Sequence, residues 1–125
     1  RLALEEADPM NGIVDNIDFA AMVPLQFLRI ADQSPAQLDL VRLLLLGGSS
    51  LPASVETLSN KINTHVYHSY GMTETLSHIA LRPVNGPLVS EWFSPLEGVS
   101  VKLDKRNCLM IHAPHISSEW LITND

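Results

Sequence analysis

The chain has 125 residues, of which 46% are hydrophobic, and a formal net charge of −6. This size and composition allow one domain, or a large part of one, with a buried core. The negative charge and the lack of a Lys/Arg run argue against a nucleic-acid surface that depends on phosphate neutralisation. The longest apolar run, around residues 43–46, is far shorter than the roughly 20 residues that cross a bilayer, so we expect no membrane span.

The number of cysteines indicates whether the protein resides in a reducing or an oxidising compartment. The single Cys108 has no partner for an intramolecular disulfide and forms no thiolate cluster for zinc, so a reducing, cytoplasmic location fits best. The chain begins with Arg1 rather than Met and stops at Asp125 after an apolar stretch. We therefore expect it to be a segment of a longer protein.

The first third of the chain predicts a strand followed by helices. Residues 1–16 have weak periodicity and turn signals, which indicate a short helix and a loop. An apolar run over residues 19–23 ends at Pro24, and apolar residues then recur at helical spacing. Ser34-Pro35 has the form of an N-cap followed by proline in the first turn of another short helix.

The middle of the chain predicts a parallel sheet. The run Leu43 to Leu46 indicates a strand that is buried on both faces, as in parallel sheets covered by helices. Gly47-Gly48 follows directly, and a helical pattern then extends to Ile62. The short alternating segment His65-Val66-Tyr67 predicts the next strand of the same sheet.

A second glycine loop follows that strand, with the sequence Tyr70-Gly71-Met72-Thr73-Glu74. A glycine bend lets backbone approach a ligand, an aromatic ring can stack on a base, a hydroxyl can reach a phosphate, and a carboxylate can hold Mg²⁺. Ligands of open α/β sheets bind at the carboxyl ends of the strands. The sequence therefore predicts a nucleotide site where the two glycine loops meet.

The pattern changes from Ser77 onward to short strands separated by Pro and Gly turns. Alternation over residues 99–103 suggests a half-exposed antiparallel sheet. We therefore predict an α/β fold in which a parallel sheet with flanking helices is followed by a small antiparallel β-rich subdomain. Residues 1–76 form the α/β part with the nucleotide-binding loops in this prediction, and residues 77–125 form the β-rich part.

The order of these segments resembles a known superfamily. The segments are Met22-Val23-Pro24, Leu45-Leu46-Gly47-Gly48, the loop from Tyr70 to Glu74, and Leu121-Ile122-Thr123-Asn124-Asp125. They resemble the adenylate-forming (ANL) superfamily, which comprises acyl-CoA synthetases, luciferases and peptide-synthetase adenylation domains. Because the loop runs into Ser77-His78, the chain is most similar within it to the o-succinylbenzoate–CoA ligases of menaquinone biosynthesis.

The resemblance implies an ATP-dependent acid–CoA ligase. Such enzymes join a carboxylic acid to AMP, release pyrophosphate, and let the thiol of coenzyme A displace AMP. The implied ligands are therefore ATP, Mg²⁺, coenzyme A and a small carboxylic acid, and a homodimer stays open.

The resemblance also implies which residues face the base. Tyr70 would stack on adenine, and Gly47, Gly48 and Ser49 would place backbone along the base and the acyl pocket. His68 and Ser69 would lie at the amino edge of adenine.

On the phosphate side, the resemblance places Gly71 and Met72 in the nucleotide loop. Thr73 would donate its hydroxyl to the α-phosphate, and Glu74 would coordinate Mg²⁺, so these two residues are the expected catalytic pair. Asp125 would bind the ribose hydroxyls.

Two departures from the superfamily pattern limit this prediction. Asn124 stands where glycine is usual, although asparagine tolerates similar backbone angles. The Ser/Thr/Gly-rich phosphate loop and the catalytic lysine of the carboxy-terminal domain are absent from the sequence. We therefore expect this chain alone to complete neither half-reaction.

Several alternatives stay open at this point. Another fatty or aryl acid–CoA ligase would share the nucleotide residues, and a non-catalytic nucleotide-binding module would share the fold. The histidine pairs His65/His68 and His112/His115 have a spacing that points the rings to opposite faces of a strand, so we expect no metal site there. No serine lies in a Gly-x-Ser-x-Gly elbow, so a hydrolase triad has no support.

Overall fold

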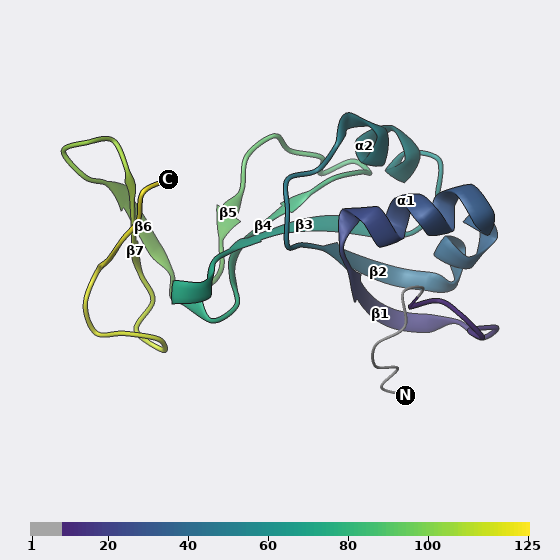
Figure 1. Cartoon of the computed structure of the whole chain (residues 1–125), viewed down its shortest axis with the longest axis horizontal. Helices are drawn as coiled ribbons and strands as arrows, with labels where there is room; N and C mark the ends of the chain where they lie inside the picture. The colour runs from purple at the N-terminus through teal and green to yellow at the C-terminus, as the bar shows by residue number, and fades with distance from the viewer. Residues whose placement is uncertain (1–8) are drawn as a thin grey trace.

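The computed structural model describes residues 9–125, which form two sheets and a pair of helices (Figure 1). The first sheet has the strand order β1-β2-β3-β4-β5. Its first three strands are parallel, and β4 and β5 run antiparallel to their neighbours. The strands are β1 (Ile17–Met22), β2 (Val41–Leu46), β3 (His65–Gly71), β4 (His78–Pro83) and β5 (Ser94–Pro95).

Helix α1 (Pro24–Gln33) follows β1, as predicted from the apolar run and Pro24. Proline suits the first turn because its missing N–H has no intrahelical partner there. The side chain of Gln26 accepts a hydrogen bond from the Val23 N–H at 3.0 Å and so satisfies an unpaired donor of the helix start. Phe27 and Ile30 form the buried face of the helix.

The remaining helices are short. After Ser34-Pro35 the chain forms the 3₁₀ helix η1 (Pro35–Leu40), without a hydrogen bond from the Ser34 side chain, so the predicted side-chain cap is wrong. Helix α2 (Ala53–Ser59) follows the first glycine loop, and the single 3₁₀ turn η2 (Thr73–Thr75) lies in the second. Helices α1 and α2 lie on the same face of the first sheet (Figure 1).

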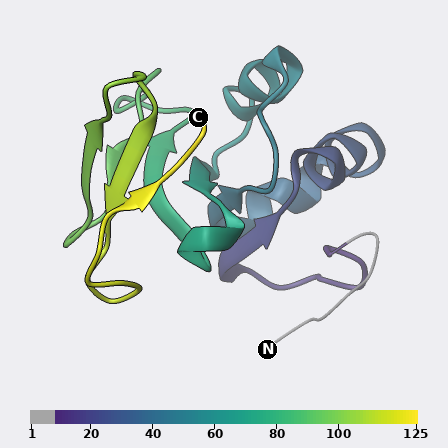
Figure 2. The ribbon, with the colours of Figure 1, turned by 60° about the vertical axis from the view of Figure 1, so that its left-hand side comes forward.

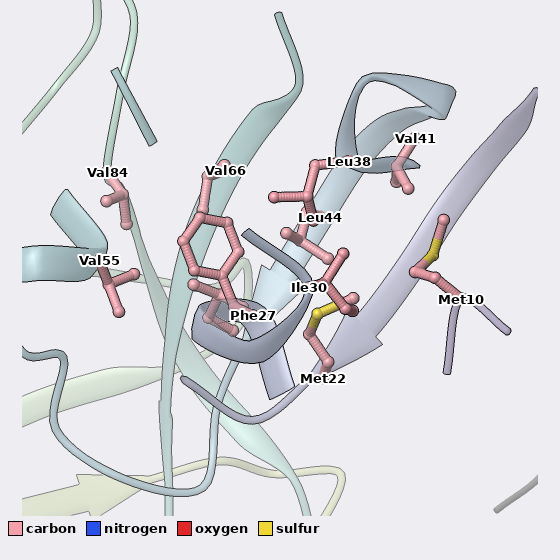
Figure 3. Close-up of a cluster of buried hydrophobic side chains, with 11 residues drawn as sticks. Met10, Met22, Phe27, Ile30, Leu38, Val41, Leu44, Val55, Val66 and Val84 are labelled. Atoms are coloured by element: carbon pink, nitrogen blue, oxygen red, sulfur yellow. The ribbon is translucent and has the colours of Figure 1, made fainter. Parts of the chain in front are cut away.

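The main core lies between this sheet and the two helices (Figure 3). Leu44 and Leu46 of β2 are completely buried, whereas Leu43 and Leu45 are only half-buried. The prediction that β2 is buried on both faces is therefore wrong for its second face. The physical reason is that helices cover only one face of the sheet within residues 9–125. The core contains Met10, Met22, Phe27, Ile30, Leu38, Val41, Leu44, Leu46, Val55, Val66 and Val84.

The second sheet is antiparallel and has the order β6-β7-β8, with β6 (Ser100–Leu103), β7 (Leu109–His112) and β8 (Leu121–Ile122). Figure 2 shows it beside the first sheet, with the yellow C-terminal segment returning from β8. A second, small cluster of buried residues, Ile79, Ile111 and Ala113, packs with Val99 and Tyr70. Val101 and Leu103, which alternate with exposed polar neighbours, stay 41% and 62% exposed.

The α/β fold with a following antiparallel sheet is confirmed. The boundary between the two sheets, however, does not lie at residue 76. Strands β4 and β5 continue the first sheet by antiparallel pairing with β3, and the separate sheet begins at Ser100. The helix expected within residues 1–16 lies partly outside the described residues, and residues 9–12 form a turn. Among residues 9–125, every helix is too short or too polar to cross a membrane.

Candidate functional site

The two glycine loops meet at the edge of the first sheet that is formed by the carboxyl ends of β2 and β3. Strands β2 and β3 are parallel with Leu46 opposite His68, so both strands end at this edge. The Ser69 hydroxyl donates to the Leu46 carbonyl at 3.2 Å. A Cβ atom on Gly47 would lie 2.4 Å from that hydroxyl oxygen. Glycine at position 47 therefore allows the end of β2 and the side chain of Ser69 to lie in contact.

Tyr70 and Asp125 come together at the same edge. The Tyr70 hydroxyl donates to Asp125 Oδ2 at 2.6 Å, across 55 residues of sequence. This distance is typical of a hydroxyl that donates to an ionised carboxylate. Burial first, and then the hydrogen bond and charge of Asp125, raise the pKa of Tyr70 to about 12. The phenol therefore keeps its proton and acts as a donor at neutral pH.

The backbone of Asp125 is fixed by the second sheet. Its carbonyl accepts from the Leu109 N–H at 2.8 Å, and its N–H donates to the Thr123 hydroxyl at 3.2 Å. The same hydroxyl donates to the Leu109 carbonyl at 2.8 Å. The carboxylate of Asp125 therefore projects from an anchored backbone toward Tyr70.

The turn after Tyr70 is held from inside by Thr75. The buried Thr75 hydroxyl accepts from the Met72 N–H at 3.0 Å and lies 2.9 Å from the Met72 carbonyl and 2.7 Å from the Ser77 carbonyl. Thr73 and Glu74, the two expected catalytic residues, are exposed on the outside of this turn. The arrangement leaves their hydroxyl and carboxylate accessible to a ligand.

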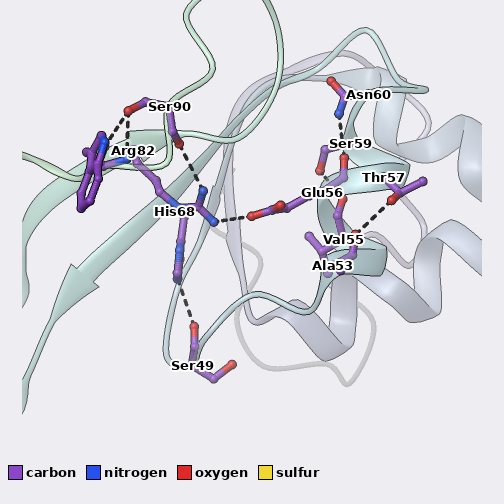
Figure 4. A network of polar contacts seen from close by, with 11 residues as sticks. Ser49, Ala53, Val55, Glu56, Thr57, Ser59, Asn60, His68, Arg82 and Ser90 are labelled. Atoms are coloured by element: carbon purple, nitrogen blue, oxygen red, sulfur yellow. Dashed lines mark hydrogen bonds and ion pairs between the residues drawn. The ribbon is translucent and has the colours of Figure 1, made fainter.

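His68 precedes Tyr70 by two residues on β3, and Figure 4 shows its ring directed toward Ser49. Its Nε2 is 3.0 Å from the Ser49 carbonyl, and its Nδ1 is buried without a partner among residues 9–125. A carbonyl accepts only, so Nε2 carries the proton and Nδ1 is an unsatisfied acceptor. Burial, more than any other effect, lowers the pKa of His68 below 6.5. The imidazole is therefore neutral at pH 7.

Phe93 completes this part of the site and was not predicted from the sequence. Its ring centroid lies 5.0 Å from that of His68 and 5.8 Å from that of Tyr70. The guanidinium carbon of Arg82 lies 5.8 Å from the same ring. An aromatic residue in a stretch without periodicity gives no local signal of such contacts, which depend on the pairing of β3 with β4.

Arg82 and Glu56 form a second feature that the sequence did not indicate. Arg82 Nη2 makes an ion pair with Glu56, and Nη1 donates to the Ser90 carbonyl at 3.2 Å (Figure 4). The pair connects α2, β4 and the segment before Phe93. It therefore fixes the side chain of Arg82, which is the partner of His68 in the pairing of β3 with β4.

Glu74 does not belong to a cluster of potential metal ligands. Within residues 9–125, no three His, Cys, Asp or Glu side chains lie close enough to hold a metal ion. One accessible carboxylate fits Mg²⁺ when phosphate oxygens and water supply the other ligands, which is the usual arrangement for this ion. A hollow of about 740 Å³ lies along β1 between residues 9 and 21 and contains none of the predicted site residues.

Comparison with known families identifies the class of protein. The family model described as AMP-binding enzyme matches residues 6–107, and the chain belongs to this family. A search of curated proteins found no match.

Solved structures agree with this assignment. A protein from Dyadobacter fermentans DSM 18053, described as an acyl-CoA synthetase (AMP-forming)/AMP-acid ligase II-like protein, is 37% identical with a TM-score of 0.89. The match covers 96% of this chain and 35% of that chain, so the present chain spans about a third of its length.

More distant structures share the fold. Escherichia coli MenE with a bound analogue of OSB-AMS is 20% identical, with a TM-score of 0.71 over 94% of this chain and 28% of that chain. The o-succinylbenzoate coenzyme A synthetase (MenE) from Bacillus subtilis, in complex with ATP and magnesium, is 19% identical. Its TM-score is 0.69 over 83% of this chain and 24% of that chain.

Proposed function

We propose that this chain is the central part of an ATP-dependent acid–CoA ligase, and that o-succinylbenzoate is its acid. The observation that carries the proposal is the meeting of Tyr70, Asp125 and the Gly47 loop at one sheet edge. This edge offers an aromatic ring that can stack on a base and a carboxylate that can accept from a diol, two groups that suit a nucleoside. The single Cys108 supports a reducing, cytoplasmic location for the enzyme.

The chemistry of this reaction class explains the groups at the edge. A free carboxylate is a poor acyl donor because its leaving group would be oxide, whereas a mixed anhydride with AMP has a good leaving group. Formation of that anhydride needs the α-phosphate held in line with the carboxylate and its growing charge neutralised.

We assign the roles of the chain's residues accordingly. Tyr70 and the backbone of Gly47, Gly48 and Ser49 would bind the base, together with His68 and Ser69. Thr73 would donate to the α-phosphate, and Glu74 would hold Mg²⁺, which neutralises phosphate charge when bound. Asp125 would accept from the ribose hydroxyls. Residues 1–76 would carry the nucleotide loops, and residues 77–125 would carry Asp125.

The Ser77 hydroxyl lies 3.2 Å from His78 Nδ1 at the exposed end of the Thr73–Thr75 turn, and this polar pair is our candidate border of the acyl pocket. The fold shared with MenE supports o-succinylbenzoate. The 37% identical protein has a more general description, so other aryl or fatty acids are the rival substrates.

The experiment is ATP–pyrophosphate exchange by the full-length protein that contains this segment, with Mg²⁺ and a panel of acids. Exchange that depends on o-succinylbenzoate supports the proposal, and thioester formation with coenzyme A completes it. Exchange with another acid alone would keep the enzyme class and reject the substrate. No exchange with any acid would reject the enzyme and favour a nucleotide-binding module.

Variants test the assigned residues in the same assay. Glu74→Gln is expected to reduce exchange about 100-fold, the scale seen when one charge-stabilising group is removed. Glu97→Gln is the matched control because Glu97 is exposed in a turn outside the site. Equal rates for the two variants would contradict the role of Glu74.

A further inference from the structure

Tyr70 and Asp125 are the only pair of predicted nucleotide-binding side chains that the described hydrogen bonds join directly. We infer that Tyr70 is a positioning residue for Asp125, and that its hydroxyl sets the preference of the site for ribose over deoxyribose. The inference rests on the proposed function, because it requires a bound nucleotide. It adds to the stacking role of the ring a separate role for the hydroxyl group.

The carboxylate of Asp125 needs a partner to have a fixed orientation. Its backbone is anchored by Leu109 and Thr123, but its side chain is exposed and would otherwise exchange rotamers freely. The donated hydrogen bond from Tyr70 occupies one lone pair of Oδ2. Oδ1 and the second lone pair of Oδ2 remain free to accept from two neighbouring hydroxyl groups.

The hydroxyl of Tyr70 is itself held in place. The ring is half-buried, packs against Phe93 with an interplanar angle of 57°, and belongs to the small cluster around Ile79 and Ile111. The phenol is a permanent donor in the neutral range, as its raised pKa also indicates. A donor on a rigid ring therefore points at an acceptor on an anchored backbone.

This geometry predicts how nucleotides are discriminated. A site that is built to accept hydrogen bonds from hydroxyl groups rejects analogues that lack them, because its acceptor stays unpaired. A carboxylate that rotates freely loses part of this contact with ATP and little with a deoxynucleotide. Removal of the Tyr70 hydroxyl should therefore weaken the preference for ribose, and not only the binding of ATP.

The experiment compares wild type and Tyr70→Phe of the full-length protein in acid-dependent ATP–pyrophosphate exchange. The substrates are ATP, 2′-deoxy-ATP and 3′-deoxy-ATP. Phenylalanine keeps the ring and removes only the hydroxyl. We expect KM for ATP to rise about 5-fold, as for the loss of one hydrogen bond, and KM for both deoxynucleotides to change less than about 2-fold.

Matched variants identify the cause. Tyr67→Phe removes the hydroxyl of the other tyrosine on β3, which faces the opposite side of the sheet from Tyr70, and should keep the wild-type preference. Asp125→Asn should reduce the preference by itself. Addition of Tyr70→Phe to Asp125→Asn should then have no further effect on the ratio of the KM values.

Two results would overturn the inference while the proposed function stands. The first is an equal rise in KM for all three nucleotides in Tyr70→Phe, which would indicate a role in stacking or folding. The second is an unchanged ribose preference in Asp125→Asn, which does not depend on how Tyr70→Phe folds. Absence of acid-dependent exchange in the wild-type protein would instead reject the proposed function.

Discussion

Backbone atoms leave no room for a side chain at Gly71. A Cβ atom there would lie 2.4 Å from the Ser77 carbonyl oxygen and 2.7 Å from His78 Cα. Both neighbours are backbone atoms, and the pairing of β3 with β4 already shifts register at this position. Only glycine fits between the strand end and the returning chain.

We therefore expect Gly71→Ala to lower the free energy of unfolding by about 1–3 kcal/mol, the range for overpacking. Urea unfolding of the chain measures this value. Gly47→Ala is the matched control because the atom it would meet is the rotatable hydroxyl of Ser69. A Gly71→Ala variant as stable as wild type would show that the loop can move away from the strand.

The buried His68 makes stability depend on pH. Burial disfavours the imidazolium, so the pKa of His68 is lower in the folded chain than the unfolded value of 6.5. The unfolded chain binds the proton more readily between these two pKa values. The contribution of His68 to stability is therefore complete above pH 6.5 and is lost as the pH falls through the folded pKa.

Urea unfolding at pH 7.5 and pH 5.5 tests this prediction. We expect wild type to lose more stability between the two pH values than His68→Gln, which cannot titrate. His65→Gln changes an exposed histidine of the same strand and should behave like wild type. The same pH dependence in wild type and His68→Gln would disprove a buried, titrating His68.

At the scale of secondary-structure elements, Asn85 joins three segments. Its Oδ1 accepts from the Val66 N–H at 2.9 Å, and its Nδ2 donates to the carbonyls of Ser59 and Thr64 at 2.6 Å and 2.9 Å. These bonds link the end of α2, the start of β3 and the chain that leaves β4. A single amide therefore helps to set where β3 begins.

We expect Asn85→Ala to reduce the free energy of unfolding by about 2–4 kcal/mol, because three hydrogen bonds are lost and buried backbone groups stay unpaired. Asn60→Ala removes one exposed bond, from Nδ2 to the Glu56 carbonyl, and should cost about 1 kcal/mol or less. Thermal unfolding of both variants gives the comparison. An equal loss of unfolding free energy in the two variants would show that the Asn85 hydrogen bonds contribute little to stability.

The elements also show what the sequence can predict. The strands around residues 19–23 and 43–46, and the glycine loops that follow β2 and β3, have strong local signals, and the structure contains them. Parallel pairing of β2 with β3 then places the two glycine loops at the same end of the sheet. The contacts of Phe93 with His68 and Tyr70 depend on antiparallel pairing of β4, which periodicity does not encode. The half-exposed second face of β2 was missed because a run of leucines has no polar side to indicate it.

At the scale of the whole molecule, the two sheets have separate cores and meet at a small apolar cluster. The main core lies under α1 and α2, whereas Ile79, Ile111 and Ala113 join β4 to the second sheet. Because Tyr70 packs on this cluster and the backbone of Asp125 is bonded to Leu109 of the second sheet, the packing of the two sheets sets how Tyr70 and Asp125 meet.

We expect Ile79→Ala to loosen this contact selectively, since truncation of a buried isoleucine costs about 2–5 kcal/mol. Hydrogen exchange followed by mass spectrometry should accelerate in residues 109–122 more than in residues 24–46. Leu44→Ala, in the main core, should give the reverse pattern. Uniform acceleration in both variants would show that the two cores unfold as one unit.

The distance in sequence between Tyr70 and Asp125 has a consequence for biosynthesis. The two residues are separated by 55 positions. A ribosome that adds about 5–20 residues per second completes that interval in roughly 3–11 seconds. For several seconds a nascent chain therefore contains Tyr70 and the turn after it without the carboxylate of Asp125. Of the residues that meet at this end of the first sheet, Asp125 is therefore made long after the others.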